Sequence, residues 1–370
     1  MHSLVSGLNS YFQRQETTTD SPLFRLHCTF TTVLLITFSL LITWTQFAND
    51  PIRCITDGVP QHIVNNYCWI TTTFTMPDAF DRPDAYFAHP GIDNDYGGDD
   101  STKKYYTYYQ WVYLALLFQA MLFYFPKWLW NSCEDGMMKA LTSGINMGVR
   151  SDEEKQGKKG KLIEYMKDPL NKSQHNKYAF FYWFCEMLCF TNVILQMIIM
   201  NWFFKGDFIT YGWKVMGFGD VDQDDRVDHM VDVFPRVTKC TFYEFGHGQT
   251  IEKKDSLCIL PLNSINEKTY IFLWFWFIIL GVVSLFLVVF RGFIIFMPSF
   301  RAMLMKTGSS SMVPEEAIRS VVSTVSVGDW WVLYMIGSNI DPLVYKEVML
   351  RLSKKNYGEI SSSQDDFHES

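Results

Sequence analysis

Four of the eight cysteines are placed where disulfide chemistry would suit them. Cys54 and Cys68 follow the first long apolar segment of the chain, and Cys240 and Cys258 precede the last one. Cysteine pairs persist as disulfides in oxidising compartments, so these two pairs indicate loops that face the cell exterior. Four cysteines allow three connectivities, and their spacing does not select one of them.

The first 13 residues have the pattern of a short amphipathic helix. Polar, uncharged residues occupy one face, and the opposite face carries Leu4, Val5, Leu8, Tyr11 and Phe12. A helix on a membrane surface usually carries Lys or Arg, and this segment has neither before Arg14. The pattern favours a helix folded into a pore mouth, with a surface helix as the alternative. Ser21 and Pro22 suit the cap and first turn of the next helix.

A polar stripe runs along the first apolar segment, where Thr29, Thr32, Ser39, Thr43 and Gln46 share one helix face. Such a stripe either packs against another helix or lines water. Packing is the commoner use. If the stripe instead lines a pore, the candidate residues are Thr32, Ser39, Thr43 and Gln46.

Glu186 is the single charge in the third apolar segment. An intramembrane carboxylate faces protein or water, because lipid cannot solvate it. The other apolar segments offer no Lys, Arg or His as a partner. We therefore expect Glu186 to make structural hydrogen bonds rather than to relay protons.

Several classes of function are excluded by what the chain does not contain. It has no P-loop, G-x-G-x-x-G, G-x-S-x-G or H-E-x-x-H pattern, so we expect no enzyme and no bound cofactor. It has no C-x-x-C and its histidines are scattered, so we expect no metal site. The formal net charge of −7, without blocks of Lys or Arg, argues against nucleic-acid binding.

Four nearly charge-free segments must position all these residues. They cover residues 28–49, 105–125, 178–204 and 269–290. About 20 apolar residues in a helix cross the hydrocarbon core of a membrane. The sequence therefore predicts an all-α membrane protein, a four-transmembrane-helix bundle with a helical cytoplasmic domain.

The distribution of charge predicts which side each loop faces. Residues 127–177 hold 10 Lys and Arg against 7 acids, whereas residues 48–104 hold 4 against 9 and residues 205–268 hold 8 against 11. The positive-inside rule places the basic loop and both termini in the cytoplasm. The predicted order is an N-terminal segment 1–27, first span 28–48, first outer loop 49–104, second span 105–126, cytoplasmic loop 127–177, third span 178–204, second outer loop 205–268, fourth span 269–291 and C-terminal region 292–370.

Two classes of function suit this architecture. Four spans cannot readily enclose a wide channel, so one class is a pore built from several copies of the chain. The other is an adhesion or scaffold protein whose long outer loops bind a partner. A polar stripe and an amphipathic terminal helix favour the pore, because adhesion requires neither.

The chain resembles the innexins, the invertebrate gap-junction proteins. Their YYQWV signature is matched by Tyr108, Tyr109, Gln110, Trp111 and Val112. Further stretches typical of the family are DPI at 50–52, YCWI at 67–70, FPRVTKC at 234–240, CILPLN at 258–263, GDWW at 328–331 and NIDP at 339–342. Within the family the chain is most similar to the insect ogre-type innexins. The tip of the second outer loop, EFGHGQ at 244–249, departs from many insect relatives, which bears on partner compatibility.

The resemblance implies a gap-junction subunit in the plasma membrane. It implies intramolecular disulfides among Cys54, Cys68, Cys240 and Cys258, and N-terminal helices that form a funnel in the pore. It further implies octameric hemichannels, as a homo-oligomer or a heteromer with other innexins, embedded in membrane lipid. Such a hemichannel docks with one on the adjacent cell and passes ions and small metabolites. The alternatives are an unpaired hemichannel, as in the pannexins, or a junctional adhesion protein without conduction.

Overall fold

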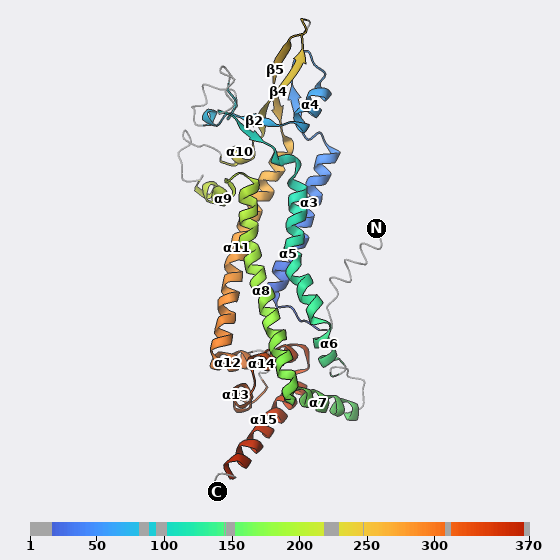
Figure 1. Cartoon of the computed structure of the whole chain (residues 1–370), viewed down its shortest axis with the longest axis vertical. Helices are drawn as coiled ribbons and strands as arrows, with labels where there is room; N and C mark the ends of the chain where they lie inside the picture. Colours follow the sequence, from blue (N-terminus) through green and yellow to red (C-terminus); the bar gives the residue numbers. More distant parts are fainter. Residues whose placement is uncertain are drawn as a thin grey trace. The chain divides into compact units, whose positions relative to one another are not determined.

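The computed structural model describes residues 17–80, 89–93, 102–143, 145, 152–217, 229–246, 248–307 and 312–365 (Figure 1). The predicted helix of residues 1–13, with all five of its apolar candidates, lies outside these residues. The chain forms two compact units. The sheet-bearing unit comprises His27–Tyr124 and Thr191–Val283, and the helical unit comprises Met1–Leu26, Phe125–Phe190 and Ser284–Ser370.

Among the residues that the structure describes, four helices are long and apolar enough to cross a membrane, as the sequence predicts. They cover Pro22–Ala48, Val112–Glu134, Asn171–Phe203 and Pro261–Phe296. The first combines α2 (Pro22–Arg25), a π-helical turn (Leu26–Phe30) and α3 (Thr31–Ala48), and the others are α5 (Val112–Glu134), α8 (Pro169–Phe203) and α11 (Pro261–Phe296). Helices α8 and α11 are longer than the predicted spans because they continue through charged residues at their ends.

Within the sheet-bearing unit the spans pack through one face each. Leu35 and Ile42 of α3, Leu116 of α5 and Leu273 of α11 are fully buried. The opposite face of α3 exposes large apolar side chains, with Trp44 74% exposed. Apolar surface of this kind is suited to lipid or to a neighbouring subunit.

Among the described residues, the two predicted outer loops, together with Tyr105 and Tyr106 just beyond the first, build a five-stranded sheet in the order β1-β5-β4-β2-β3. The strands are β1 (Arg53–Ile55), β2 (Thr73–Thr75), β3 (Lys104–Tyr106), β4 (Val237–Phe245) and β5 (Ile251–Ile259). Short helix α4 (Gln61–Ile70) connects β1 to β2, and α9 (Phe208–Gly217) and α10 (His229–Val233) lie between α8 and β4. The mostly helical class is confirmed, but the prediction of an all-α fold missed this sheet. Three of its strands have only three residues, too few to show an alternating pattern.

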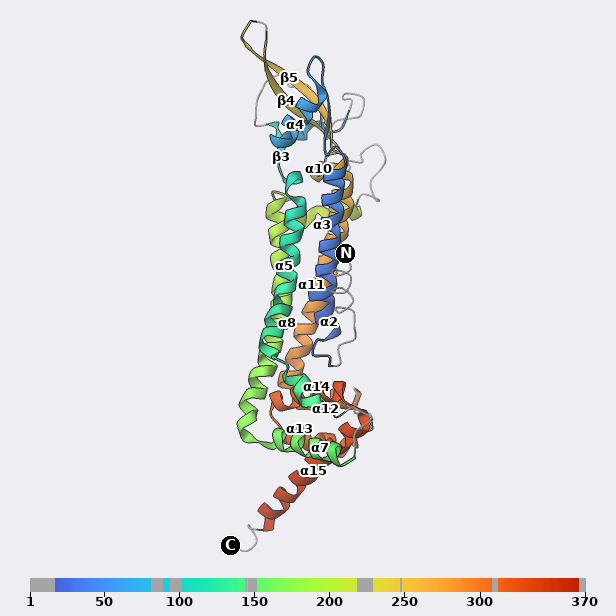
Figure 2. The ribbon, with the colours of Figure 1, turned by 90° about the vertical axis from the view of Figure 1, so that its right-hand side faces the viewer.

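The short helices of the helical unit lie close together, and one of them, α14 (Val327–Asn339), is largely buried (Figure 2). They are α6 (Met137–Thr142), α7 (Asp152–Lys167), α12 (Pro298–Thr307), α13 (Glu315–Thr324), α14 (Val327–Asn339) and α15 (Pro342–Asp365). Helix α14 is buried along most of its length, with Trp330 and Ile336 fully enclosed. It begins with a capping box, in which Ser326 and Asp329 bond to each other's backbone N–H. The predicted helical domain is therefore present.

Candidate functional site

Both disulfides join one outer loop to the other. Cys54 is bonded to Cys258 with an S–S distance of 2.04 Å, and Cys68 to Cys240 with 2.00 Å. All four side chains are fully buried. Of the three possible connectivities, the structure therefore has the one that joins Cys54 to Cys258 and Cys68 to Cys240. In the chain-entropy account, either disulfide taken alone closes a loop so long that it stabilises the fold by about 5 kcal/mol.

The strands β4 and β5 form a hairpin whose far end has no other strand beside it among the described residues. Nine residue pairs join its strands, from Val237 with Ile259 to Phe245 with Ile251. Strand β2 pairs with β4 only at Lys239. Strand β1 pairs with β5 only at the last three residues of β5, Leu257 to Ile259. The free end projects from the short strands (Figures 1 and 2).

The end of this hairpin carries exposed apolar side chains. Phe245 is 76% exposed and Ile251 is 67% exposed, and the two face each other across the strands. Unpaired strand edges and exposed apolar side chains are both features of surfaces that bind other proteins. The hairpin is therefore the strongest candidate for a contact with another protein.

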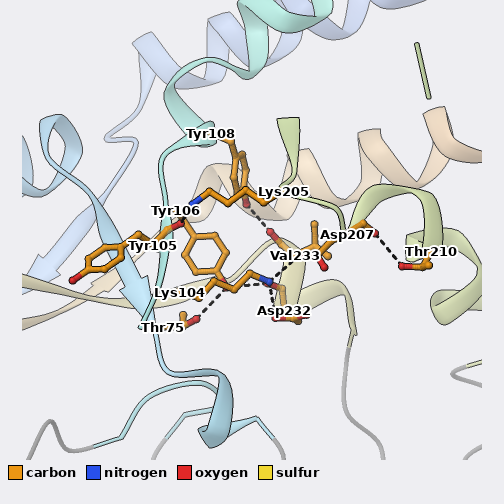
Figure 3. Close-up of polar contacts among 10 residues, drawn as sticks. All are labelled: Thr75, Lys104, Tyr105, Tyr106, Tyr108, Lys205, Asp207, Thr210, Asp232 and Val233. Atoms are coloured by element: carbon orange, nitrogen blue, oxygen red, sulfur yellow. Dashed lines mark hydrogen bonds and ion pairs between the residues drawn. The ribbon is translucent and has the colours of Figure 1, made fainter. Parts of the chain in front are cut away.

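A charged cluster ties the base of the first loop to the second (Figure 3). The Lys104 ammonium lies 2.9 Å from a carboxylate oxygen of Asp207 and 3.1 Å from one of Asp232. Burial by itself would lower the pKa of Lys104, but its interactions with Tyr106, Asp232 and Asp207 outweigh that effect and raise the pKa. Lys104 therefore stays charged at every physiological pH.

Two tyrosines extend this cluster. The Tyr106 hydroxyl donates to the carbonyl of Asp232 at 2.9 Å and lies 3.0 Å from the Thr75 hydroxyl. Burial raises the pKa of Tyr106 to about 12, so the hydroxyl remains a donor. The Tyr108 hydroxyl donates to the carbonyl of Val233 at 2.9 Å. The end of the first loop is thus fixed to α10 at three points.

The YYQWV residues support the disulfide-bearing helix α4. The Tyr109 hydroxyl donates to the carbonyl of Cys68 at 3.2 Å, and the Gln110 amide donates to the carbonyl of Trp69. Val112 is fully buried, whereas Trp111 is 57% exposed. The resemblance identified these residues, and the hydrogen bonds of Tyr108, Tyr109 and Gln110 give three of the five a positioning role.

The polar stripe of α3 makes contacts with α5. The Ser39 hydroxyl donates to the carbonyl of Tyr113 at 2.9 Å, and the Thr32 hydroxyl lies 3.4 Å from the carbonyl of Ala120. Both side chains are buried. The structure therefore favours the packing alternative for Thr32 and Ser39. Pore lining stays a prediction for all four candidates, Thr32, Ser39, Thr43 and Gln46.

Glu186 has a basic partner, contrary to expectation. The Arg291 guanidinium donates to both of its carboxylate oxygens, at 2.6 and 2.8 Å. The side chains are 1% and 11% exposed, so the pair is buried. The uncharged segment ends at Phe290, but α11 continues past it and carries Arg291 as its next residue. Both groups of the pair thus lie on long helices.

Comparison with known proteins finds similarity to innexins along nearly the whole chain. The Innexin family model matches residues 20–356. Innexin inx1 of Schistocerca americana is 52% identical over 356 residues, which cover 96% of this chain and 98% of that protein. Innexin inx1 of Drosophila melanogaster is also 52% identical, over 96% of this chain and 97% of its own length. Innexin shaking-B of the same organism is 43% identical over 96% of this chain and 95% of its own. The ogre-type assignment stays a prediction.

Proposed function

Since this chain belongs to the innexin family, whose members are gap-junction channel proteins, we propose that it docks to the adjacent cell through the β4–β5 hairpin. The protein is a multi-pass plasma-membrane subunit of an intercellular channel. Its outer loops face the extracellular space and its termini the cytoplasm. Several copies, eight in the family pattern, surround a pore embedded in membrane lipid, either alone or mixed with other innexins.

The observation that carries this proposal is the anchored hairpin with a free apolar end. Its base is bonded to the first loop through Cys54–Cys258 and Cys68–Cys240, so the hairpin keeps one direction. Its end exposes Phe245 and Ile251. A rigid projection loses little conformational entropy when it binds, which favours docking between two cells.

Conduction through the docked pore is passive and involves no catalytic step. Residues 1–13 line the entrance as a funnel, and ions and small metabolites pass between the two cytoplasms. The polar faces of the remaining wall come from residues such as Thr43 and Gln46.

Paired cells expressing only this chain test the docking step. The double substitution Phe245→Asp and Ile251→Asp, present in one cell or in both, should abolish the junctional current while single-cell hemichannel current remains. The remaining hemichannel current shows that the variant folds and assembles. Undiminished junctional current in the doubly substituted pairs would exclude the hairpin end as the docking surface.

The same experiment distinguishes adhesion without conduction, which the projecting hairpin alone would also support. In that case paired cells form contact plaques that depend on Phe245 and Ile251, yet neither junctional nor hemichannel current is recorded.

A further inference from the structure

Residues 18–21, here called the N-terminal linker, are held by side chains from three helices of the helical unit. They lie immediately before α2 and after the segment assigned to the pore funnel. The holding side chains come from α14, α5 and α8. Linkers between elements are usually held by few contacts, so this concentration calls for a physical reason.

Asn339, the last residue of α14, holds the linker backbone in both directions. Its side-chain oxygen accepts the Thr18 N–H at 2.6 Å, and its side-chain nitrogen donates to the Thr18 carbonyl at 2.9 Å. The same nitrogen donates to the carbonyl of Met335 at 2.8 Å, which orients the amide. A side chain that donates to and accepts from one residue fixes the position of that residue, rather than merely attracting it.

Asp20 makes a buried ion pair with α5. Its carboxylate lies 3.0 Å from the Lys127 ammonium, and the side chains are 6% and 12% exposed. Buried ion pairs depend strongly on geometry, because each charge has lost its water and relies on its partner. This pair therefore sets where the linker crosses α5.

Ser21 joins the linker to the Glu186–Arg291 pair. Its N–H donates to the Tyr182 hydroxyl at 2.9 Å, and its own hydroxyl donates to the Glu186 carboxylate at 3.3 Å. The Arg291 guanidinium, bound to that carboxylate, lies 4.6 Å from the centre of the Trp331 ring in α14. Helix α14 thus reaches the linker twice, directly through Asn339 and indirectly through Trp331.

We propose that Asn339 and the Asp20–Lys127 pair are positioning residues that hold the start of the first span against α14 and α5, so that the C-terminal helices influence conduction. The inference rests on the proposed function, in which the first span belongs to a conducting subunit.

A charge-reversal cycle separates positioning from a simple contribution to folding. Asp20→Lys and Lys127→Asp should each change the ratio of open to closed times of single junctional channels by about 5-fold or more, the lower end of usual coupling between sites. The double reversal should restore the ratio, because the ion pair is re-formed. Junctional plaque area is measured in the same cells, so that poor assembly is recognised.

A matched control uses the ion pair Lys306–Glu315, in the same unit but with both side chains exposed, 62% and 46%. Reversing Lys306→Glu should leave the open-to-closed ratio unchanged. The proposal is overturned if the double reversal gates no better than the single ones, or if the single reversals gate as the unsubstituted chain does.

Hydrogen–deuterium exchange of the purified full chain tests the anchor without any current. Asn339→Ala should speed exchange of the Thr18 amide by about 2- to 10-fold, since one hydrogen bond is lost. Tyr182→Phe should do the same for the Ser21 amide and leave Thr18 protected. Unchanged exchange at Thr18 in Asn339→Ala would show that the linker is not held, whatever the channel does.

The two measurements also separate this inference from the proposed function. If unsubstituted chains give no junctional current, the proposed function fails while the exchange result still decides whether Asn339 holds the linker. If exchange rises in Asn339→Ala but gating is unaltered, the linker is held without controlling conduction, and the inference is wrong.

Discussion

The buried pair of Glu186 and Arg291 gives the sharpest stability prediction. Each carboxylate oxygen accepts one guanidinium hydrogen bond, at 2.6 and 2.8 Å, with the carboxylate 1% exposed. Replacing Arg291 with Met leaves the buried carboxylate without its counter-charge. Removing one partner of such a pair destabilises a protein by about 3–5 kcal/mol.

The double variant should behave differently from either single one. Glu186→Leu with Arg291→Met leaves no buried charge, and replacing a whole buried pair with apolar residues is often close to neutral. The expected order of stability places the double variant above both single variants. The coupling of the two sites is then obtained directly from the double-mutant cycle.

Thermal unfolding of the detergent-solubilised assembly, followed by size-exclusion chromatography with fluorescence detection, measures these differences. For a unit of 150–250 residues about 2–4 °C correspond to 1 kcal/mol, so each single variant should unfold about 6–20 °C lower. Arg319→Met is the matched control, because Arg319 pairs with Glu315 while 73% exposed. A double variant that unfolds as far below the starting protein as the two single shifts added together would refute the reasoning.

Four further outcomes are expected. Cys54→Ser should abolish junctional current, because the hairpin loses one of the two bridges that hold its base to the first loop, whereas the exposed Cys133→Ser should leave the current unchanged, as paired-cell recordings can show. Lys104→Met should lower the thermal midpoint at every pH between 6 and 9. The raised pKa keeps Lys104 charged throughout this range, and its contribution to stability is lost only when the pH rises through that raised pKa. Burial would raise the pKa of Asp329, but hydrogen bonds from His175 and Ser326 outweigh that and lower it. The contribution of Asp329 is therefore present above the ordinary carboxyl pKa and lost as the pH falls through the lowered value, and Asp329→Asn should flatten the acid limb of a plot of thermal midpoint against pH. Thr32→Val and Ser39→Ala should leave single-channel conductance unchanged, because these hydroxyls face α5; a clear change in conductance would return them to the pore wall.

The four spans and the presence of two cysteines in each intervening polar loop could be predicted because their signals are local. A run of uncharged residues is visible without knowing its neighbours, and so are cysteines in two polar loops. The same locality explains the failure at Arg291. A charge that ends an uncharged run looks like a boundary, although the helix continues through it and the charge is neutralised by Glu186.

The remaining features depend on contacts between distant residues. The connectivity of the cysteines follows from the register of β1 on β5, where Cys54 lies opposite Cys258. The contact between Thr18 and Asn339 joins residues 321 positions apart, and neither residue type indicates it. Resemblance identified the YYQWV residues, but only the structure shows that Tyr109 and Gln110 bind the backbone of α4.

Junctional conductance between two cells that express only this chain tests the central claim most directly. With simultaneous voltage clamp of both cells, we predict a current that flows from cell to cell and disappears when either cell lacks the protein. Plaques of correctly assembled protein between the two cells, with no current passing from one cell to the other, would contradict it.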